Sequence, residues 1–170
     1  MLEYPLAHLK GEACESRRDP NNWMLYLSET PRRNRLTRGA LYEDHLVYAG
    51  HVRADQGPVY LGYLMAELKR HAPGLAEQTN EEAQALGLLV ARLSRALKAS
   101  EGAEHIYLLV FGDQVPNLHL HLFPRYPETP QAYWGPRIAE WPDAPRGDAA
   151  EVAAVCERLR TWLATEPHPT

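Results

Sequence analysis

Apolar positions recur along the chain with two different periods, and each period predicts one type of element. Over residues 80–99, apolar side chains repeat at helical spacing on one face, and Thr79 with Glu82 forms a capping box that would begin a helix. A second amphipathic helix is predicted over residues 148–163. Strands are predicted over residues 23–27, in two short runs within 40–49, over 59–65 and over 105–111, because these stretches are rich in β-forming residues.

The order of these elements predicts the fold class. Only a short turn at residues 112–116 separates the strand at 105–111 from the strand that follows, so the two strands are expected to pair as an antiparallel hairpin. Strands, one helix, further strands and a terminal helix favour an α+β fold over a doubly wound parallel sheet. At 170 residues, the whole chain is expected to form a single domain. Six prolines and two tryptophans argue against regular structure in residues 124–146, which either close a pocket or cover the edges of the core.

Residues 117–125, with the sequence Asn-Leu-His-Leu-His-Leu-Phe-Pro-Arg, alternate polar and apolar side chains. In an extended strand this period of two places the three leucines on one face, which suits a core. The other face receives Asn117, His119 and His121, spaced roughly 6–7 Å apart at the usual strand rise. Two imidazoles and an amide on one face are a poor core, but they suit a site for an anion, a metal or a nucleophile.

Composition argues against several classes of protein. A net charge of −4 and a pI near 6.1 argue against a general nucleic-acid-binding protein, which usually carries a basic excess. The two cysteines, Cys14 and Cys156, form neither a metal-ligand motif nor a disulfide framework, which favours a reducing compartment. No apolar run is long enough to span a membrane, and the first residues lack the features of a signal peptide. We therefore expect a soluble, cytoplasmic protein that binds neither nucleic acid nor membrane.

Three interpretations of the histidine strand stay open on the residues alone. In the first, histidines at positions i and i+2 chelate zinc or iron, with a third ligand from one of four other histidines: His45, His51, His71 or His105. No acidic residue stands at ligand spacing, since Phe123 occupies the next position on that face. In the second, an imidazole nitrogen attacks phosphorus while a second histidine and an amide hold the phosphate oxygens. In the third, the histidines are ordinary polar surface residues.

The histidine strand resembles a known signature. Residues 119–125 resemble the second half of the histidine triad (HIT) signature, His-φ-His-φ-His-φ-φ followed by Pro-Arg, where φ is an apolar residue. Residues 62–71 look like the family's central strand with its Gly-His and Pro-Lys-Arg-His segments, and residues 112–116 look like its turn before the triad. The resemblance covers residues 38–130 and leaves 131–170 as a C-terminal extension with a helix. It implies a HIT-like antiparallel sheet with one packed central helix.

The resemblance also implies roles for individual residues. His119 falls on the middle position of the triad, which is the nucleophile in this superfamily, and His121 falls on the third position, which contacts the phosphates. Asn117 replaces the first histidine but keeps the backbone carbonyl that helps to orient the nucleophile, so it joins the catalytic set. Four further residues are expected to bind the substrate: Gln114 in the turn, Arg125 after the proline of the motif, Tyr63 in place of a family histidine, and His71.

The implied function is hydrolysis or transfer at the α-phosphate of a nucleotide conjugate through a covalent nucleotidyl-histidine intermediate. The candidate substrates are dinucleoside polyphosphates, nucleoside phosphoramidates and adenylylated compounds. No cofactor or bound metal is expected, although a polyphosphate substrate can carry Mg²⁺, and the resemblance also implies a homodimer. The rival hypothesis is a nucleotide-binding sensor or scaffold that has lost turnover, which the replacements at Asn117 and Tyr63 keep open.

Overall fold

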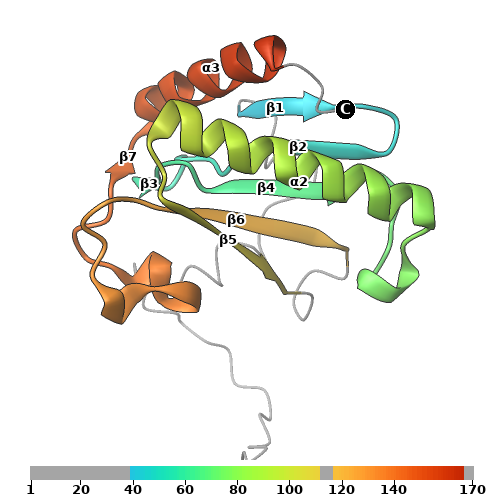
Figure 1. Cartoon of the computed structure of the whole chain (residues 1–170), viewed down its shortest axis with the longest axis horizontal. Helices are drawn as coiled ribbons and strands as arrows, with labels where there is room; N and C mark the ends of the chain where they lie inside the picture. The colour runs from blue at the N-terminus through green and yellow to red at the C-terminus, as the bar shows by residue number, and fades with distance from the viewer. Residues whose placement is uncertain (1–38, 112–116, 167–170) are drawn as a thin grey trace, which may run out of the picture.

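The computed structural model describes residues 39–111 and 117–166, and its centre is a five-stranded sheet (Figure 1). The strands lie in the order β1-β2-β4-β6-β5, and their respective bounds are Ala40–Glu43, Val47–His51, Leu64–Leu68, His119–Arg125 and His105–Val110. Every neighbouring pair is antiparallel, including the expected pairing of β5 with β6. The predicted α+β class with an antiparallel sheet is therefore confirmed.

Two helices pack on one face of this sheet. After the short 3-10 helix η2 (Leu75–Glu77), α2 spans Asn80–Glu101 and begins with the predicted capping box, in which Thr79 and Glu82 each accept a hydrogen bond from the other's backbone N–H. α3 spans Ala149–Thr165 and begins with a second capping box. Figure 1 shows α2 crossing the sheet and α3 lying beside β1. Neither helix in the described part of the chain is long and apolar enough to cross a membrane.

The face of the sheet beneath the helices forms the main core. The three leucines of the histidine strand point into it, as their period of two predicted: Leu118, Leu120 and Leu122 are buried. Burying one leucine side chain contributes roughly 1.5–3 kcal/mol, and a shift of one residue in register would turn all three toward the other face. Packing of the leucines therefore decides that the histidines of β6 point away from the helices.

The opposite face of the sheet carries the histidines and a second apolar cluster. Two short 3-10 helices, η3 (Gln131–Tyr133) and η4 (Gly135–Glu140), belong to the proline-rich C-terminal segment. This segment places Ile138 and Trp141 in one cluster with Tyr63 and Phe123. The segment therefore covers an edge of the core, which is one of the two roles predicted for it, and it also lines a pocket described below.

The strand predicted over residues 59–65 is wrong in one respect, because the chain turns in its middle. β3 (Val59–Tyr60) pairs with β7 (Arg146–Gly147) in a small second sheet, and β4 begins only at Leu64. Gly62 lies between them with φ +82°, a left-handed conformation that glycine adopts without strain. A Cβ at Gly62 would also lie 2.7 Å from the hydroxyl oxygen of Tyr126. The β-forming residues on both sides of Gly62 concealed this turn in the sequence.

Candidate functional site

His119 is the first residue of β6, and a backbone carbonyl fixes its tautomer. The side chain is buried, and its Nδ1 lies 2.6 Å from the carbonyl oxygen of Asn117. A carbonyl oxygen can only accept a hydrogen bond, so Nδ1 carries the proton and donates it. In the neutral ring, the lone pair is then on Nε2, which is the nitrogen that can attack an electrophile.

His121 lies beside His119 on the same face of β6, fully buried. The centroids of the two imidazole rings are 4.8 Å apart and their planes are nearly perpendicular, at 77°. Nδ1 of His121 lies 2.6 Å from the hydroxyl oxygen of Tyr63, and its ring contacts that of Phe111 at 5.6 Å between centroids. The centre of the site is therefore a pair of adjacent imidazoles whose Nδ1 atoms meet different partners, a backbone carbonyl and a phenol.

Asn117 supplies the carbonyl for His119 and uses its side chain to hold a neighbouring segment. Its Oδ1 accepts a hydrogen bond from the N–H of Ala72 at 3.3 Å, and its Nδ2 donates to the carbonyl of Leu118 at 3.3 Å. The carbonyl of Ala72 in turn accepts from the N–H of Leu118 at 2.6 Å. These bonds attach the segment after β4 to the start of β6, and both polar atoms of the Asn117 side-chain amide form hydrogen bonds to the backbone.

The family of this chain follows from comparison of its sequence with models of known protein families. The family model described as the HIT domain matches residues 34–128, which is more than half of the chain. The chain belongs to the HIT family. Membership supports nucleotide-binding hydrolase or transferase activity in general, because proteins of the HIT superfamily are usually enzymes of these two kinds. Among curated proteins, no match to the sequence was found.

Solved structures of histidine triad proteins share the fold. A Hit-like protein involved in cell-cycle regulation from Bartonella henselae is 19% identical, with a TM-score of 0.56 over 76% of this chain and 90% of that chain. A hypothetical histidine triad nucleotide-binding protein from Sulfolobus tokodaii is 20% identical, with a TM-score of 0.57 over 74% and 83% of the two chains. A zinc-bound histidine triad family protein from Mycobacterium smegmatis is 17% identical, with a TM-score of 0.54 over 74% and 83%. These similarities show the HIT fold alone.

Two of the four residues expected to bind substrate come close to the histidine strand from opposite ends of β4. Tyr63 immediately precedes β4 and reaches His121 with its hydroxyl group. His71 is exposed and follows the other end of β4, next to Ala72, whose backbone is bonded to the start of β6. Their direct contact with substrate stays a prediction.

Arg125, the third of these residues, is not brought to the histidine pair. Arg125 ends β6, and the length of the strand, roughly 20 Å, separates it from His119. Its guanidinium lies 4.0 Å from the ring centroid of Trp134 and donates to Glu104 at 3.3 Å. Gln114 lies outside the described residues. Substrate binding by these two residues also stays a prediction.

Two neighbours of the histidine pair were not predicted from the sequence, Glu67 and Phe111. Glu67 of β4 stands directly opposite His119 in the β4–β6 pairing, where Cβ atoms are typically about 4.5–5.5 Å apart. Phe111 follows β5 and contacts the ring of His121. The period of two within β4 could have placed Glu67 on a polar face. Only the register of the strands reveals that this face is the one that holds His119.

His51, one of the candidate third ligands for a metal, forms hydrogen bonds to the backbone through both ring nitrogens. Its Nδ1 donates to the carbonyl of Val52 at 2.6 Å, and its Nε2 accepts from the N–H of Gly62 at 2.9 Å. Burial lowers the pKa of His51 to about 4, so the ring is neutral. Within residues 39–111 and 117–166, no three His, Cys, Asp or Glu side chains gather in a cluster that could hold a metal ion.

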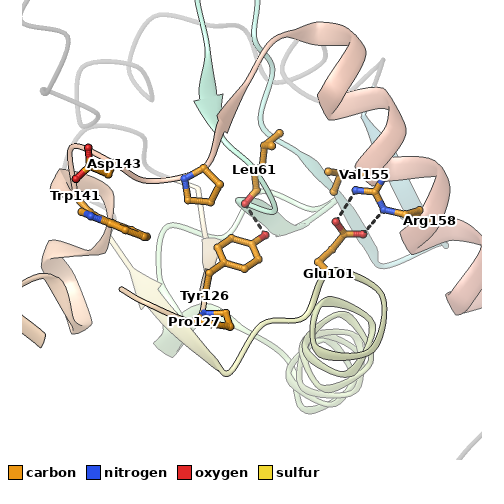
Figure 2. Close-up of a pocket in the computed structure, with 9 residues that line it drawn as sticks. Leu61, Glu101, Tyr126, Pro127, Trp141, Asp143, Val155 and Arg158 are labelled. Carbon is orange, nitrogen blue, oxygen red and sulfur yellow. Dashed lines mark hydrogen bonds and ion pairs between the residues drawn. The ribbon is translucent and has the colours of Figure 1, made fainter. Parts of the chain in front are cut away.

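A pocket lies at the other end of the sheet, beyond the end of β6. Figure 2 shows Trp141 and Tyr126 on its walls, with the hydroxyl of Tyr126 donating to the carbonyl of Leu61 at 2.9 Å. Arg158 of α3 donates to both carboxylate oxygens of Glu101 at the end of α2, at 2.9 and 2.7 Å. Neither histidine of the pair lines this pocket, and these two charged side chains are bonded to each other. The histidine pair therefore lies toward the opposite end of β6 from this pocket.

Proposed function

We propose that this HIT protein is a nucleotide hydrolase or nucleotidyl transferase in which His119 attacks the α-phosphate of a nucleotide conjugate. The observation that carries the proposal is the 2.6 Å hydrogen bond from Nδ1–H of His119 to the carbonyl of Asn117. This bond selects the tautomer with its lone pair on Nε2 and holds the ring in one orientation. Family membership supports the substrate class, and the bond prepares a nucleophile for that substrate.

The proposed reaction consists of two displacements at phosphorus. First, Nε2 of His119 forms a bond to the α-phosphorus as the bond to the leaving group breaks, and the leaving group takes the bonding electrons and then a proton. The nucleotidyl-imidazole ring now carries a positive charge. The carbonyl of Asn117 stabilises this charge, because a hydrogen bond from a charged donor is roughly twice as strong as a neutral one. Water then attacks phosphorus, the N–P bond breaks, and a nucleoside monophosphate is released.

Hydrogen-bond donors around the phosphate complete the proposed site. Negative charge builds on the phosphate oxygens or the leaving group during each displacement, and donors already aimed at these atoms lower the barrier. We assign the phosphate contact to His121, because its ring lies beside that of His119. His121, Asn117 and Gln114 are the candidate donors to the leaving group. Dinucleoside polyphosphates, nucleoside phosphoramidates and adenylylated compounds all fit, since each carries a leaving group on an α-phosphorus.

The proposed mechanism uses no resident metal. The Nδ1 atoms of His119 and His121 meet Asn117 and Tyr63, and the backbone engages both nitrogens of His51. We expect elemental analysis of the purified protein to find no stoichiometric zinc and chelators to leave activity unchanged with a substrate that carries no magnesium. One metal ion per chain, with activity lost on chelation, would revive the metal interpretation of the histidine strand.

We further propose that the protein is a homodimer. β5 is the last strand in the sheet order β1-β2-β4-β6-β5, and its Leu108 and Val110 are 45% and 38% exposed. An outer strand with exposed apolar side chains is a surface that proteins usually cover. Light scattering during size-exclusion chromatography should give twice the mass of the chain, and the variant Val110→Lys should shift the protein toward the monomer. A wild-type protein with the mass of one chain would contradict this.

Capture of the covalent intermediate tests the proposed function. After rapid mixing with an adenosine 5′-phosphoramidate, intact-mass spectrometry should show wild-type protein enlarged by one adenylyl group, and acid should release this group because the N–P bond is acid-labile. His119→Ala should form no adduct, whereas His45→Ala, which removes an exposed histidine outside the site, should react like the wild type. Nucleotide binding without any adduct or turnover would favour the sensor or scaffold hypothesis.

A further inference from the structure

We propose that Tyr63 is a positioning residue that determines which ring nitrogen of His121 carries the proton. The proposal rests on the function proposed above, in which His121 contacts the substrate phosphate. The observation that carries it is the 2.6 Å distance between the Tyr63 hydroxyl oxygen and Nδ1 of His121. Both side chains are buried, at 8% and 0% exposed, so this contact is made away from bulk water.

The hydroxyl group of Tyr63 is held in place by packing and by the backbone. Its ring stacks on that of Phe123, with centroids 4.0 Å apart and planes at 20°. Its backbone N–H donates to the carbonyl of Tyr60 at 3.2 Å, and its carbonyl accepts from the N–H of Val52 at 3.1 Å. Because packing already restricts rotation of this ring, forming the hydrogen bond to the histidine costs little further side-chain entropy.

The direction of this hydrogen bond follows from the task of His121. A hydroxyl group can donate to Nδ1 or accept from it. If Tyr63 donates, the proton of the neutral imidazole is on Nε2, and the ring presents an N–H to a phosphate oxygen. If Tyr63 accepts, Nε2 carries a lone pair, which repels an anionic oxygen. In the neutral ring, only donation by Tyr63 gives His121 the Nε2–H donor that stabilises charge on the phosphate.

The two adjacent imidazoles are thus held in opposite tautomers by opposite partners. The carbonyl of Asn117 can only accept, so it keeps the proton of His119 on Nδ1 and the lone pair on Nε2. The hydroxyl of Tyr63 donates, so it keeps the proton of His121 on Nε2. One ring is prepared to attack phosphorus and the other to hold its oxygens.

The first test is a direct measurement of the tautomers. Two-bond ¹H–¹⁵N correlation spectra of the imidazole rings in the wild-type protein should show His119 protonated on Nδ1 and His121 protonated on Nε2. A purely structural role for Tyr63 makes no such demand on His121. The Nδ1–H tautomer of His121 in the folded wild-type protein would overturn the proposal, whether or not any variant folds.

The second test removes one oxygen atom from each of two tyrosines. Tyr63→Phe keeps the ring that stacks on Phe123, and the rate of adduct formation should fall roughly tenfold, the scale of one neutral hydrogen bond, while KM changes by less than about twofold. Both tautomers of His121 should then be detected. Tyr60→Phe is the matched control, because its hydroxyl is buried in the same cluster but donates to the carbonyl of Pro124 at 2.7 Å. This variant should lose stability but keep the wild-type tautomers and rate.

The outcomes separate this proposal from the function on which it rests. Tyr63→Phe with a wild-type rate and an unchanged His121 tautomer would overturn the positioning role. Equal losses of rate in Tyr63→Phe and Tyr60→Phe would also overturn it, because packing alone would then explain the effect. Absence of any adduct in the wild-type protein would instead contradict the proposed function.

Discussion

His51 on β2 and His119 on β6 are both buried histidines whose Nδ1 donates to a backbone carbonyl at 2.6 Å, yet we propose different tasks for their Nε2 atoms. Nε2 of His51 accepts the N–H of Gly62 at 2.9 Å, so this ring joins two backbone segments. His119 has the same tautomer, but it lies at the start of β6 beside the ring of His121. Burial and a carbonyl partner therefore do not by themselves make a histidine catalytic. The second nitrogen of His51 is bonded to the backbone, whereas we propose that the second nitrogen of His119 meets the substrate.

Removal of each imidazole should therefore have different consequences, and the largest is expected at His119. His119→Ala should lower kcat by more than about a hundredfold while leaving nucleotide affinity within about tenfold, roughly 1.4 kcal/mol. The reason is that the lost nitrogen forms its bond to phosphorus only as the reaction proceeds. Steady-state kinetics and calorimetric binding measure the two quantities. If the variant keeps more than a few per cent of wild-type turnover, the assignment of the nucleophile is wrong.

The contrasting prediction for His51 concerns stability in acid. Above about pH 6.5 His51 is neutral in both the folded and the unfolded chain, and its contribution to stability is complete. As the pH falls toward its folded-state pKa of about 4, the unfolded chain binds a proton that the buried ring does not. The free energy of unfolding should therefore decrease over this interval, by an amount on the order of 3 kcal/mol.

A non-titrating variant isolates this effect. Urea unfolding of His51→Gln should show lower stability at neutral pH but a shallower decrease between about pH 6.5 and 4 than the wild type. Hydrogen bonds from Arg70 lower the pKa of Glu82 to about 2, and the resulting acid sensitivity is shared by both proteins, so the difference between them reports on His51. The variant should still form the nucleotidyl adduct. Identical pH dependence in the two proteins would show that burial of His51 has no such effect.

The smallest expected change comes from restoring the first histidine of the triad. Asn117→His should raise kcat by roughly tenfold or less, because one charged donor in place of a neutral one is worth on the order of 1–2 kcal/mol. The gain should fade as the pH rises through the pKa of the introduced imidazole, which is about 6.5 when unperturbed. A pH–rate profile measures both. A clear loss of activity would mean that the site depends on the bonds of Asn117 to Ala72 and Leu118.

The sequence predicted those parts of the fold and site that depend on local patterns. The capping box of Thr79 and Glu82 and the buried face of the histidine strand follow from spacing along one segment, and both are confirmed. The turn at Gly62 was missed, because residues on both sides of it favour strands. The local pattern could not predict the partner of the second nitrogen of His51, because that partner, the N–H of Gly62, lies near the end of the connection between β2 and β4.

The contact between Tyr63 and His121 could not be predicted for a related reason. The two residues are 58 positions apart, with α2 and β5 between them in the chain. They meet because β4 lies next to β6, in a register that sets Met65 opposite His121. Register depends on packing of the whole sheet rather than on either strand. The sequence therefore indicated that Tyr63 belonged to the site, but not that a histidine would be its partner.

The stereochemical course at phosphorus distinguishes a covalent nucleotidyl-histidine mechanism from direct hydrolysis. A substrate with a chiral α-phosphorus, such as a phosphorothioate with one oxygen isotope label, is converted to a product whose configuration can be measured by ³¹P spectroscopy. Attack by His119 followed by attack by water inverts the phosphorus twice, so the proposed mechanism predicts net retention of configuration. Net inversion would mean that water displaces the leaving group in one step, and it would contradict the covalent nucleotidyl-histidine intermediate.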